Sequence, residues 1–235
     1  MTERESEAFR GAATTHGAVA AGLRSSYGSV VSWESYFSAN LKHDDAEAWG
    51  QMVSNLRGLH NALASMQFDR ESVDALAEDI DAWRDRLAPF AGEEIEQANG
   101  RVPQLPVRGH AMVPEFMIRS AGDGRVDGAV TFGRWFMGGG MAVHGGAITL
   151  LFDEVLGILA SAAAKTITRT AYLRTDYRAL TPIDTELDVS AWIDRVEGRK
   201  IFVKGEVRHG DVVCAEADAL FLQLTPEQGL GKRTS

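Results

Sequence analysis

Five glycines surround a single histidine in the nine residues 138–146, GGGMAVHGG. The segment has neither the Gly-Lys-Ser/Thr ending of a Walker loop nor the G-x-G-x-x-G spacing of a dinucleotide-binding loop. Gly145 and Gly146 come directly before an apolar run, at the expected start of a helix. There the backbone N–H groups are unobstructed and the helix dipole adds partial positive charge, so a carbonyl oxygen can be held and polarised. The structural alternative is that the two glycines let the helix pack closely on a sheet.

A carboxylate interrupts the apolar run Ala147–Ala164, because Asp153 and Glu154 lie near its middle. The run is as long as a membrane helix, but charge at its centre is costly in lipid, which favours the core helix of a globular protein. An ionised carboxylate inside an apolar helix costs several kcal/mol unless it is paired or solvated. Asp153 therefore marks either a reactive site or an ion pair. Glu154 is rotated from it by about 100° and is expected to be structural.

The distance between these two features predicts how many chains a complete site needs. Asp153 follows Gly145 by eight residues, which is roughly 12 Å along a helix axis at about 1.5 Å per residue. The two groups therefore cannot act on one carbonyl within a single chain. Two antiparallel copies of the helix would set the glycine end of one beside the carboxylate of the other. A working site at these residues would thus require at least a dimer, and we expect a homodimer or homotetramer.

The elements that must position these residues are mostly strands. Segments rich in β-branched and aromatic residues, separated by turn signals such as Glu197-Gly198, precede and follow the apolar helix. A helix without a polar face must be covered nearly all round, and an antiparallel sheet curled around it is the simplest cover. Two strands are expected before the helix and four after it, at Met112–Ser120 (the weakest), Arg125–Phe136, Thr166–Leu180, Glu186–Val196, Lys200–His209 and Val212–Leu224.

A helical hairpin is expected at residues 45–100, ahead of this domain. Apolar residues recur every three or four positions in 45–67 and again from Val73 to Leu87, with Asp69 or Ser72 as a cap for the second helix. The hairpin is either a docking surface or lid, or an appendage whose apolar stripe packs on the main domain. Residues 1–44 are expected to be poorly structured or partly helical, 101–109 a proline-containing linker, 110–228 the main domain and 229–235 a flexible tail.

Charge is divided unevenly between these parts. The net charge of −9 comes from residues 1–100, which hold 17 Asp/Glu and 8 Lys/Arg, whereas residues 101–235 hold 16 of each. Net acidity opposes binding to nucleic acid or anionic lipid, so neither partner is expected. Cys214 is the single cysteine, so no disulfide can form within the chain. With no signal peptide or membrane span recognised, a cytoplasmic location is expected.

Three segments together resemble a known family. They are VHGGAITLLFD at 143–153, TAYLRTDYR at 170–178 and DRVEGRKIFV at 194–203. This combination is similar to the hotdog-fold acyl-CoA thioesterases of the 4-hydroxybenzoyl-CoA and PaaI-like superfamily, and it covers about residues 110–225. The resemblance implies an α+β hotdog fold, in which an antiparallel sheet of five or six strands wraps one long central helix. The N-terminal helical extension lies outside it.

The resemblance also implies roles for individual residues. Asp153 matches the catalytic carboxylate, a general base or nucleophile, and Gly145 the glycine whose N–H helps to form the oxyanion hole. His144 shapes the loop beside it, and Thr170 helps to orient the attacking water. Positions that meet coenzyme A match Gly146, Asp176, Arg178, Arg199 and Lys200. At Asp176 relatives often have a neutral side chain, which is a departure from the family pattern.

The expected function is hydrolysis of an acyl-CoA thioester to free acid and coenzyme A, with a place in lipid metabolism. No cofactor is expected apart from coenzyme A as part of the substrate, and neither the histidines nor Cys214 have the spacing of a metal site. One alternative is a non-catalytic acyl-CoA-binding or scaffold protein that recruits a partner through its helical extension. A less favoured alternative is a hotdog enoyl-CoA hydratase or dehydratase, because the His-containing hydratase signature is missing.

Overall fold

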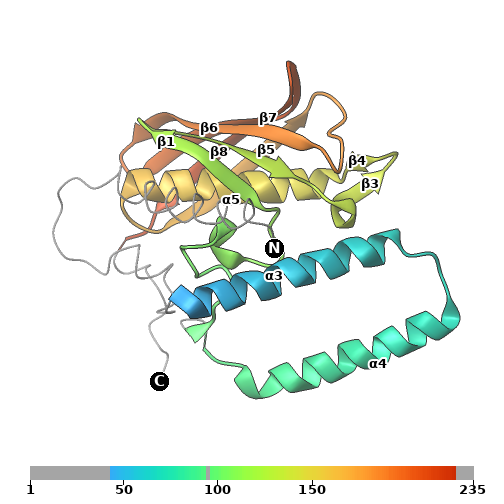
Figure 1. The fold of residues 1–235 in the computed structure, drawn as a ribbon. Coiled ribbons are helices and arrows are strands. Elements are labelled where there is room, and N and C mark those ends of the chain that lie inside the picture. Colours follow the sequence, from blue (N-terminus) through green and yellow to red (C-terminus); the bar gives the residue numbers. More distant parts are fainter. Residues whose placement is uncertain (1–42, 94–95, 226–235) are drawn as a thin grey trace.

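A six-stranded antiparallel sheet wraps around one long helix in the computed structural model (Figure 1), which describes residues 43–93 and 96–225. The strand order is β1-β2-β6-β7-β8-β5, and the helix α5 (Gly145–Ala164) lies against the sheet. This arrangement confirms the predicted hotdog fold. The strands are β1 (Phe116–Gly122), β2 (Arg125–Thr131), β5 (Thr168–Tyr177), β6 (Glu186–Glu197), β7 (Lys200–His209) and β8 (Val212–Gln223).

The core forms between α5 and the inward faces of the strands. Alternate residues of β7, among them Ile201, Val203 and Val207, are buried, which is the pattern of a strand with one face on the core. The helix and β7 approach each other closely at Gly205, where a Cβ atom would meet Leu156 Cδ2 at 3.0 Å. Among the described residues, α5 alone is long and apolar enough to cross a membrane. Its burial under the sheet accounts for that composition.

A β-bulge in β5 decides which side chains of this edge strand face α5. The pairing of β5 with β8 shifts register between Thr170 and Tyr172. Thr170 contacts the helix on one side of the bulge and Thr175 contacts it on the other. These two threonines are five positions apart and would face opposite ways in a regular strand. The extra residue therefore turns both toward α5, as bulges next to functional sites often do.

The helix α3 (His43–Ser65) packs on the hotdog domain. Its Trp49 Nε1 donates to the Gly109 carbonyl at 3.0 Å, and its Arg57 forms an ion pair of 2.9 Å with Glu115. Asn61 Oδ1 accepts from the Trp135 amide at 3.0 Å, in the short 3-10 helix η4 (Arg134–Phe136). These polar contacts fix one face of α3 on the segments just before β1 and just after β2.

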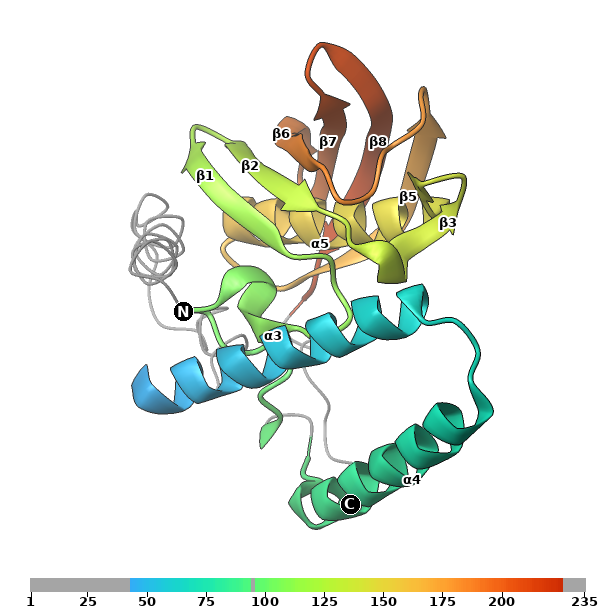
Figure 2. The ribbon, with the colours of Figure 1, turned by 45° about the vertical axis from the view of Figure 1, so that its right-hand side comes forward.

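The helix α4 (Arg70–Leu87) follows α3 after a short connection and lies farther from the sheet (Figure 2). Asp69 caps it, because its side chain accepts a hydrogen bond from the Ser72 amide at 2.9 Å. No residue of α4 is buried. The predicted pair of helices is present, but the apolar stripe of α4 is not packed on the main domain in the described part of the chain.

The segment 101–109, expected as a linker, is largely buried. It contains the short helix η3 (Pro106–Gly109), in which Val107 and Arg108 have positive φ angles of 44° and 54°. Arg108 pairs with Glu154 of α5, so this segment is fastened to the central helix. Two further differences concern residues 125–143: β2 ends at Thr131, and a small hairpin of β3 (Met137–Gly139) and β4 (Ala142–Val143) precedes α5. The expectations for residues 1–42 and 229–235 lie outside the described residues.

Candidate active site

His144 caps the N-terminus of α5 and leaves one amide of the first turn open. Its Nδ1 accepts a hydrogen bond of 3.0 Å from the Gly146 amide, which occupies that donor. The Gly145 amide, in contrast, donates no hydrogen bond to any of residues 43–93 and 96–225. An open amide at a helix N-terminus, assisted by the helix dipole, is suited to bind a carbonyl oxygen or an oxyanion. In this turn His144 therefore caps the helix, whereas the Gly145 amide is available to a ligand.

A cluster of hydroxyl groups holds Gly145 in place. Tyr177 Oη donates to the Gly145 carbonyl at 2.9 Å and lies 3.0 Å from Thr149 Oγ1. Thr149 Oγ1 in turn donates to Thr175 Oγ1 at 3.2 Å. A Cβ atom on Gly145 would come within 2.9 Å of Tyr177 Oη. A side chain at position 145 would therefore have to displace Tyr177. The sequence reasoning missed this cluster.

Asp153 lies about two turns farther along α5, and its side chain meets Thr170. Thr170 Oγ1 donates to Asp153 Oδ1 at 2.8 Å, and both residues are exposed. No described residue donates a hydrogen bond to the other carboxylate oxygen, Oδ2. The carboxylate is thus held by one oxygen and accessible at the other, as an activator of water would need to be.

Glu154 has a structural environment. Its side chain is 12% exposed and forms an ion pair of 2.5 Å with Arg108. This pairing compensates the charge of a largely buried carboxylate. The two neighbouring carboxylates of α5 therefore differ as expected from their rotation about the helix axis, and only Asp153 faces the exposed side.

The residues expected to meet coenzyme A fall into two groups at opposite ends of the sheet. Gly146, Asp176 and Arg178 lie at the end that holds the helix N-terminus. Arg199 and Lys200 lie at the other end, because Lys200 pairs with Leu222 and Leu222 pairs with Arg169 at the start of β5. From Arg169 to Arg178 the chain spans roughly 30 Å at about 3.3 Å per residue. One chain does not bring the two groups together.

Acidic neighbours accompany the cations at the first of these ends. Arg178 Nε lies 2.6 Å from Glu216 Oε2, and this contact raises the pKa of the guanidinium above its ordinary value. Asp176 lies 3.1 Å from Arg174 and 3.6 Å from Arg178. A phosphate group would therefore have to compete with carboxylates for these arginines. It would not meet cations that lack an acidic partner.

A shallow apolar groove, open to solvent, lies between the β1–β2 hairpin and the C-terminal half of α5. Its lining includes Ile118, Val155, Ile158, Leu159 and Ala162. The helix residues in this set are rotated from Asp153 by about 140–240° at 100° per residue, on the opposite side of α5. The groove is therefore not part of the Asp153 site of the same chain.

The aromatic residues that follow β2 pack on the core or on α3. Phe132 is fully buried in the core, and Phe136 meets it edge to face at 5.9 Å. Trp135 stacks on His60 of α3 with ring centroids 4.4 Å apart.

Among the described residues, no group of three or more His, Cys, Asp or Glu side chains is arranged to hold a metal ion.

Comparisons with known proteins agree with this fold. Residues 140–216 match the family model of the thioesterase superfamily. Acyl-coenzyme A thioesterase THEM4 of Rattus norvegicus is 34% identical over 90 residues, which are 37% of this chain and 38% of that protein. The Bos taurus protein of the same name is 32% identical over 88 residues, 37% of this chain and 35% of the relative. The matched region thus spans less than two fifths of the length of these relatives.

A solved structure extends the likeness beyond the hotdog domain. The crystal structure of a thioesterase superfamily protein has a TM-score of 0.63 and 27% identity, and the match covers 74% of this chain and 94% of that one. Strands β1 to β8 with α5 occupy only 108 of the 235 residues, or 46%. Because few residues follow β8, the match must also include residues that precede β1. The predicted resemblance is confirmed: residues 116–223 have the hotdog fold, and residues 140–216 match the family model of the thioesterase superfamily.

Proposed function

We propose that this protein is an acyl-CoA thioesterase whose active site is shared between two chains. The observation that carries the proposal is the hydrogen bond from Thr170 to Asp153 on an exposed face of α5, two turns from an open amide at Gly145. The relatives that match residues of this domain are named acyl-coenzyme A thioesterases, which supports the choice of substrate class.

The proposed reaction begins with the thioester carbonyl oxygen on the Gly145 amide of one chain. Asp153 of the other chain takes a proton from water through its accessible oxygen, while Thr170 fixes the carboxylate. The water oxygen bonds to the carbonyl carbon, and the negative charge that develops on the carbonyl oxygen is stabilised at the helix N-terminus. Collapse breaks the carbon–sulfur bond, and the coenzyme A sulfur receives the proton from Asp153. Direct attack by Asp153 on the thioester carbonyl is the alternative first step.

Two antiparallel chains would bring together groups that lie far apart within one chain. The Gly145 amide and the Asp153 carboxylate are about 12 Å apart along α5. The two groups of expected coenzyme A contacts also lie at opposite ends of the sheet. If a second copy ran antiparallel beside α5, Gly146 and Arg178 of one chain would approach Arg199 and Lys200 of the other. One two-fold arrangement of the two chains would therefore bring together both the reacting groups and the residues expected to bind coenzyme A.

Release of coenzyme A from a panel of acyl-CoA thioesters tests the proposed function. We expect Asp153→Asn to lower kcat by about two to four powers of ten, because the amide cannot accept a proton from water. The matched control is Asp123→Asn, in the exposed turn between β1 and β2. Its φ angle is 48°, which asparagine tolerates, so this variant should keep full turnover.

The same assay separates the alternatives. An enoyl-CoA hydratase would change the enoyl absorbance without releasing a thiol, and an acyl-CoA-binding protein would do neither. Turnover of Asp153→Asn at the wild-type rate would remove Asp153 from the reaction, and no thiol release from any acyl-CoA by the wild-type protein would contradict the proposed function itself.

A further inference from the structure

The helix α4 carries a regular apolar stripe that the rest of the described chain leaves open. Its residues are spaced three and four apart, the repeat by which helices pack against each other in coiled coils and bundles. We define the α4 stripe as Val73, Leu76, Ile80, Trp83 and Leu87 together with Phe90 just beyond the helix. In heptad terms Val73, Ile80 and Leu87 are a positions, and Leu76, Trp83 and Phe90 are d positions.

Exposure increases along the α4 stripe toward its C-terminal end. Val73 and Leu76 are half-buried near the connection to α3, whereas Ile80 and Trp83 are 41% and 42% exposed. Leu87 is 68% exposed and Phe90 83% exposed. A contiguous row of large apolar side chains, unlike scattered single ones, marks an interaction surface.

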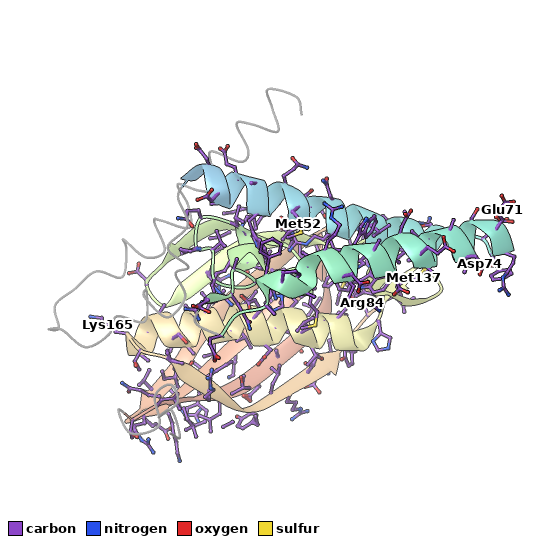
Figure 3. The ribbon with its side chains drawn as sticks, turned by 90° about the horizontal axis from the view of Figure 1, so that it is seen from below. Met52, Glu71, Asp74, Arg84, Met137 and Lys165 are labelled. Atoms are coloured by element: carbon purple, nitrogen blue, oxygen red, sulfur yellow. The ribbon has the colours of Figure 1, made fainter. Side chains whose placement is uncertain are left out.

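The polar face of α4 is organised independently of the stripe. Arg70 pairs with Asp74 at 2.7 Å and Arg84 pairs with Asp81 at 2.8 Å, each within the helix. Figure 3 shows Glu71 and Asp74 near one end of the helix and Arg84 toward the other. Such pairs and the Asp69 cap contribute a few tenths to about 1 kcal/mol each, too little to make an isolated helix of this length fully stable. The helix therefore gains stability when its stripe is covered.

We propose that the α4 stripe packs antiparallel against the α4 stripe of a second copy of this chain. Aligned about the midpoint between residues 81 and 82, Ile80 meets the partner's Trp83 and Leu76 meets the partner's Leu87. Val73 then meets the partner's Phe90, so every a position faces a d position. Each layer joins a smaller and a larger side chain or two leucines, which suits interdigitation.

Charge complementarity supports this partner and this direction. Asp79 and Arg86 are the charged g positions that flank the stripe. In the antiparallel pair, the g positions of the two helices meet, which sets Asp79 against the partner's Arg86 and Arg86 against the partner's Asp79. Neither residue has an ion pair within the described part of the chain. The pairing therefore gives each of them an opposite charge.

The apolar stripe of α3 offers no such match. It consists of Met52, Leu56, Leu59, Leu63 and Met66, and the positions that flank it include Asn55, His60 and Ala62. If α4 folded back on its own α3, Asp79 and Arg86 would meet side chains without a complementary charge. The second copy of α4 is therefore the better occupant of the α4 stripe than α3 of the same chain.

Light scattering coupled to size exclusion tests the proposed contact. We expect Ile80→Glu to halve the molar mass of the wild-type assembly, because it places a charge in the centre of the apolar layers. Turnover per chain should be unchanged, because the α4 contact would join two of the dimers that complete the active sites, and its loss would leave each dimer intact. An equal mass for the wild-type protein and Ile80→Glu would overturn the proposal, whatever the activity of either.

Charge reversal tests the register. Asp79→Arg and Arg86→Asp, each alone, set like charges against each other twice in the pair and should weaken association by about tenfold. The double variant restores both pairs and should return to wild-type affinity. Glu78→Arg makes the same charge change as Asp79→Arg on the outer face of α4 and is the matched control. A double variant no better than the single ones, or a control as weak as Asp79→Arg, would contradict the antiparallel pairing.

Discussion

Thr170 holds one oxygen of the Asp153 carboxylate, and this contact limits what each residue can do in the proposed reaction. The hydroxyl donates to Oδ1 at 2.8 Å, so its lone pairs stay available to accept from a water molecule near Oδ2. Thr170 is therefore a positioning residue that fixes both the carboxylate and the water. The sequence predicts this pair only through the family resemblance, because seventeen residues and a turn separate the two.

We expect Thr170→Val to lower kcat by about a hundredfold and to leave the free energy of unfolding almost unchanged, because the side chain keeps its shape but loses the hydroxyl. Thr170→Ser restores the hydroxyl and should recover most of the activity. Steady-state kinetics on one acyl-CoA would check both variants, and equal losses for valine and serine would show that the hydroxyl is not what matters.

Tyr177 is the residue of the candidate site that sequence reasoning did not find. Its hydrogen bond to the Gly145 carbonyl depends on the bulge in β5, which brings Thr175 and Tyr177 to the same side of the strand as Thr170. The alternation of a regular strand would have placed them on the opposite face. A bulge has no clear sequence signal in β5, so this cluster could be recognised only from the register.

Tyr177→Phe should lower kcat by about tenfold, because the Gly145 peptide loses the hydroxyl that orients it. The effect should fall on kcat more than on KM, since the phenol does not itself meet the reacting carbon in the proposed arrangement. Kinetics with saturating and limiting acyl-CoA would separate the two parameters. A change confined to KM would instead place Tyr177 in substrate binding.

At the scale of elements, the sequence predicts the bounds of the strands and the central helix closely. It does not predict the structure of the connections. Periodicity predicts β6, β7 and β8 to within a residue or two, because alternate residues face the core. The segment 101–109 was expected as a loose linker, since prolines interrupt any period. It is instead buried, because Arg108 reaches Glu154 and neighbouring apolar residues pack beneath α3. Such long-range contacts leave no local pattern.

His110, which follows this segment, should make the stability of the protein depend on pH. Burial is the largest cause that lowers the pKa of His110 from its ordinary 6.5, and its Nδ1 accepts a hydrogen bond from the Met112 amide at 3.2 Å. Below pH 6.5 the unfolded chain binds a proton at His110 more readily than the folded chain does. The contribution of the neutral imidazole is therefore present above pH 6.5 and is lost as the pH falls through the lowered pKa.

The measurement compares urea midpoints of the wild-type protein and His110→Asn at pH 7.5 and pH 5.5. The asparagine oxygen can accept from the same amide but does not titrate, so the variant should lose less stability between the two pH values. Equal losses in both proteins would assign the pH dependence to other groups.

At the scale of the whole molecule, the acidic residues and the candidate site lie in different parts of the chain. The acidic first hundred residues include α3 and α4, whereas the candidate site lies in the neutral part of the chain. A match over 74% of the chain to a thioesterase superfamily structure extends beyond the hotdog domain into residues that precede β1. Sequence periodicity predicts the two helices but not that α4 stands away from the sheet, because an amphipathic stripe does not identify its partner.

The central claim is that each active site takes Gly145 from one chain and Asp153 from another. Two inactive variants test it: Asp153→Asn, and Gly145→Ala, whose Cβ would meet Tyr177 Oη at 2.9 Å. In a mixed dimer of the two, one site has both defects and the other has both native residues. Random pairing of equal amounts, by co-expression or joint refolding, should therefore restore about a quarter of the wild-type activity in a symmetric dimer. A mixture as inactive as its two components would contradict a site shared between chains.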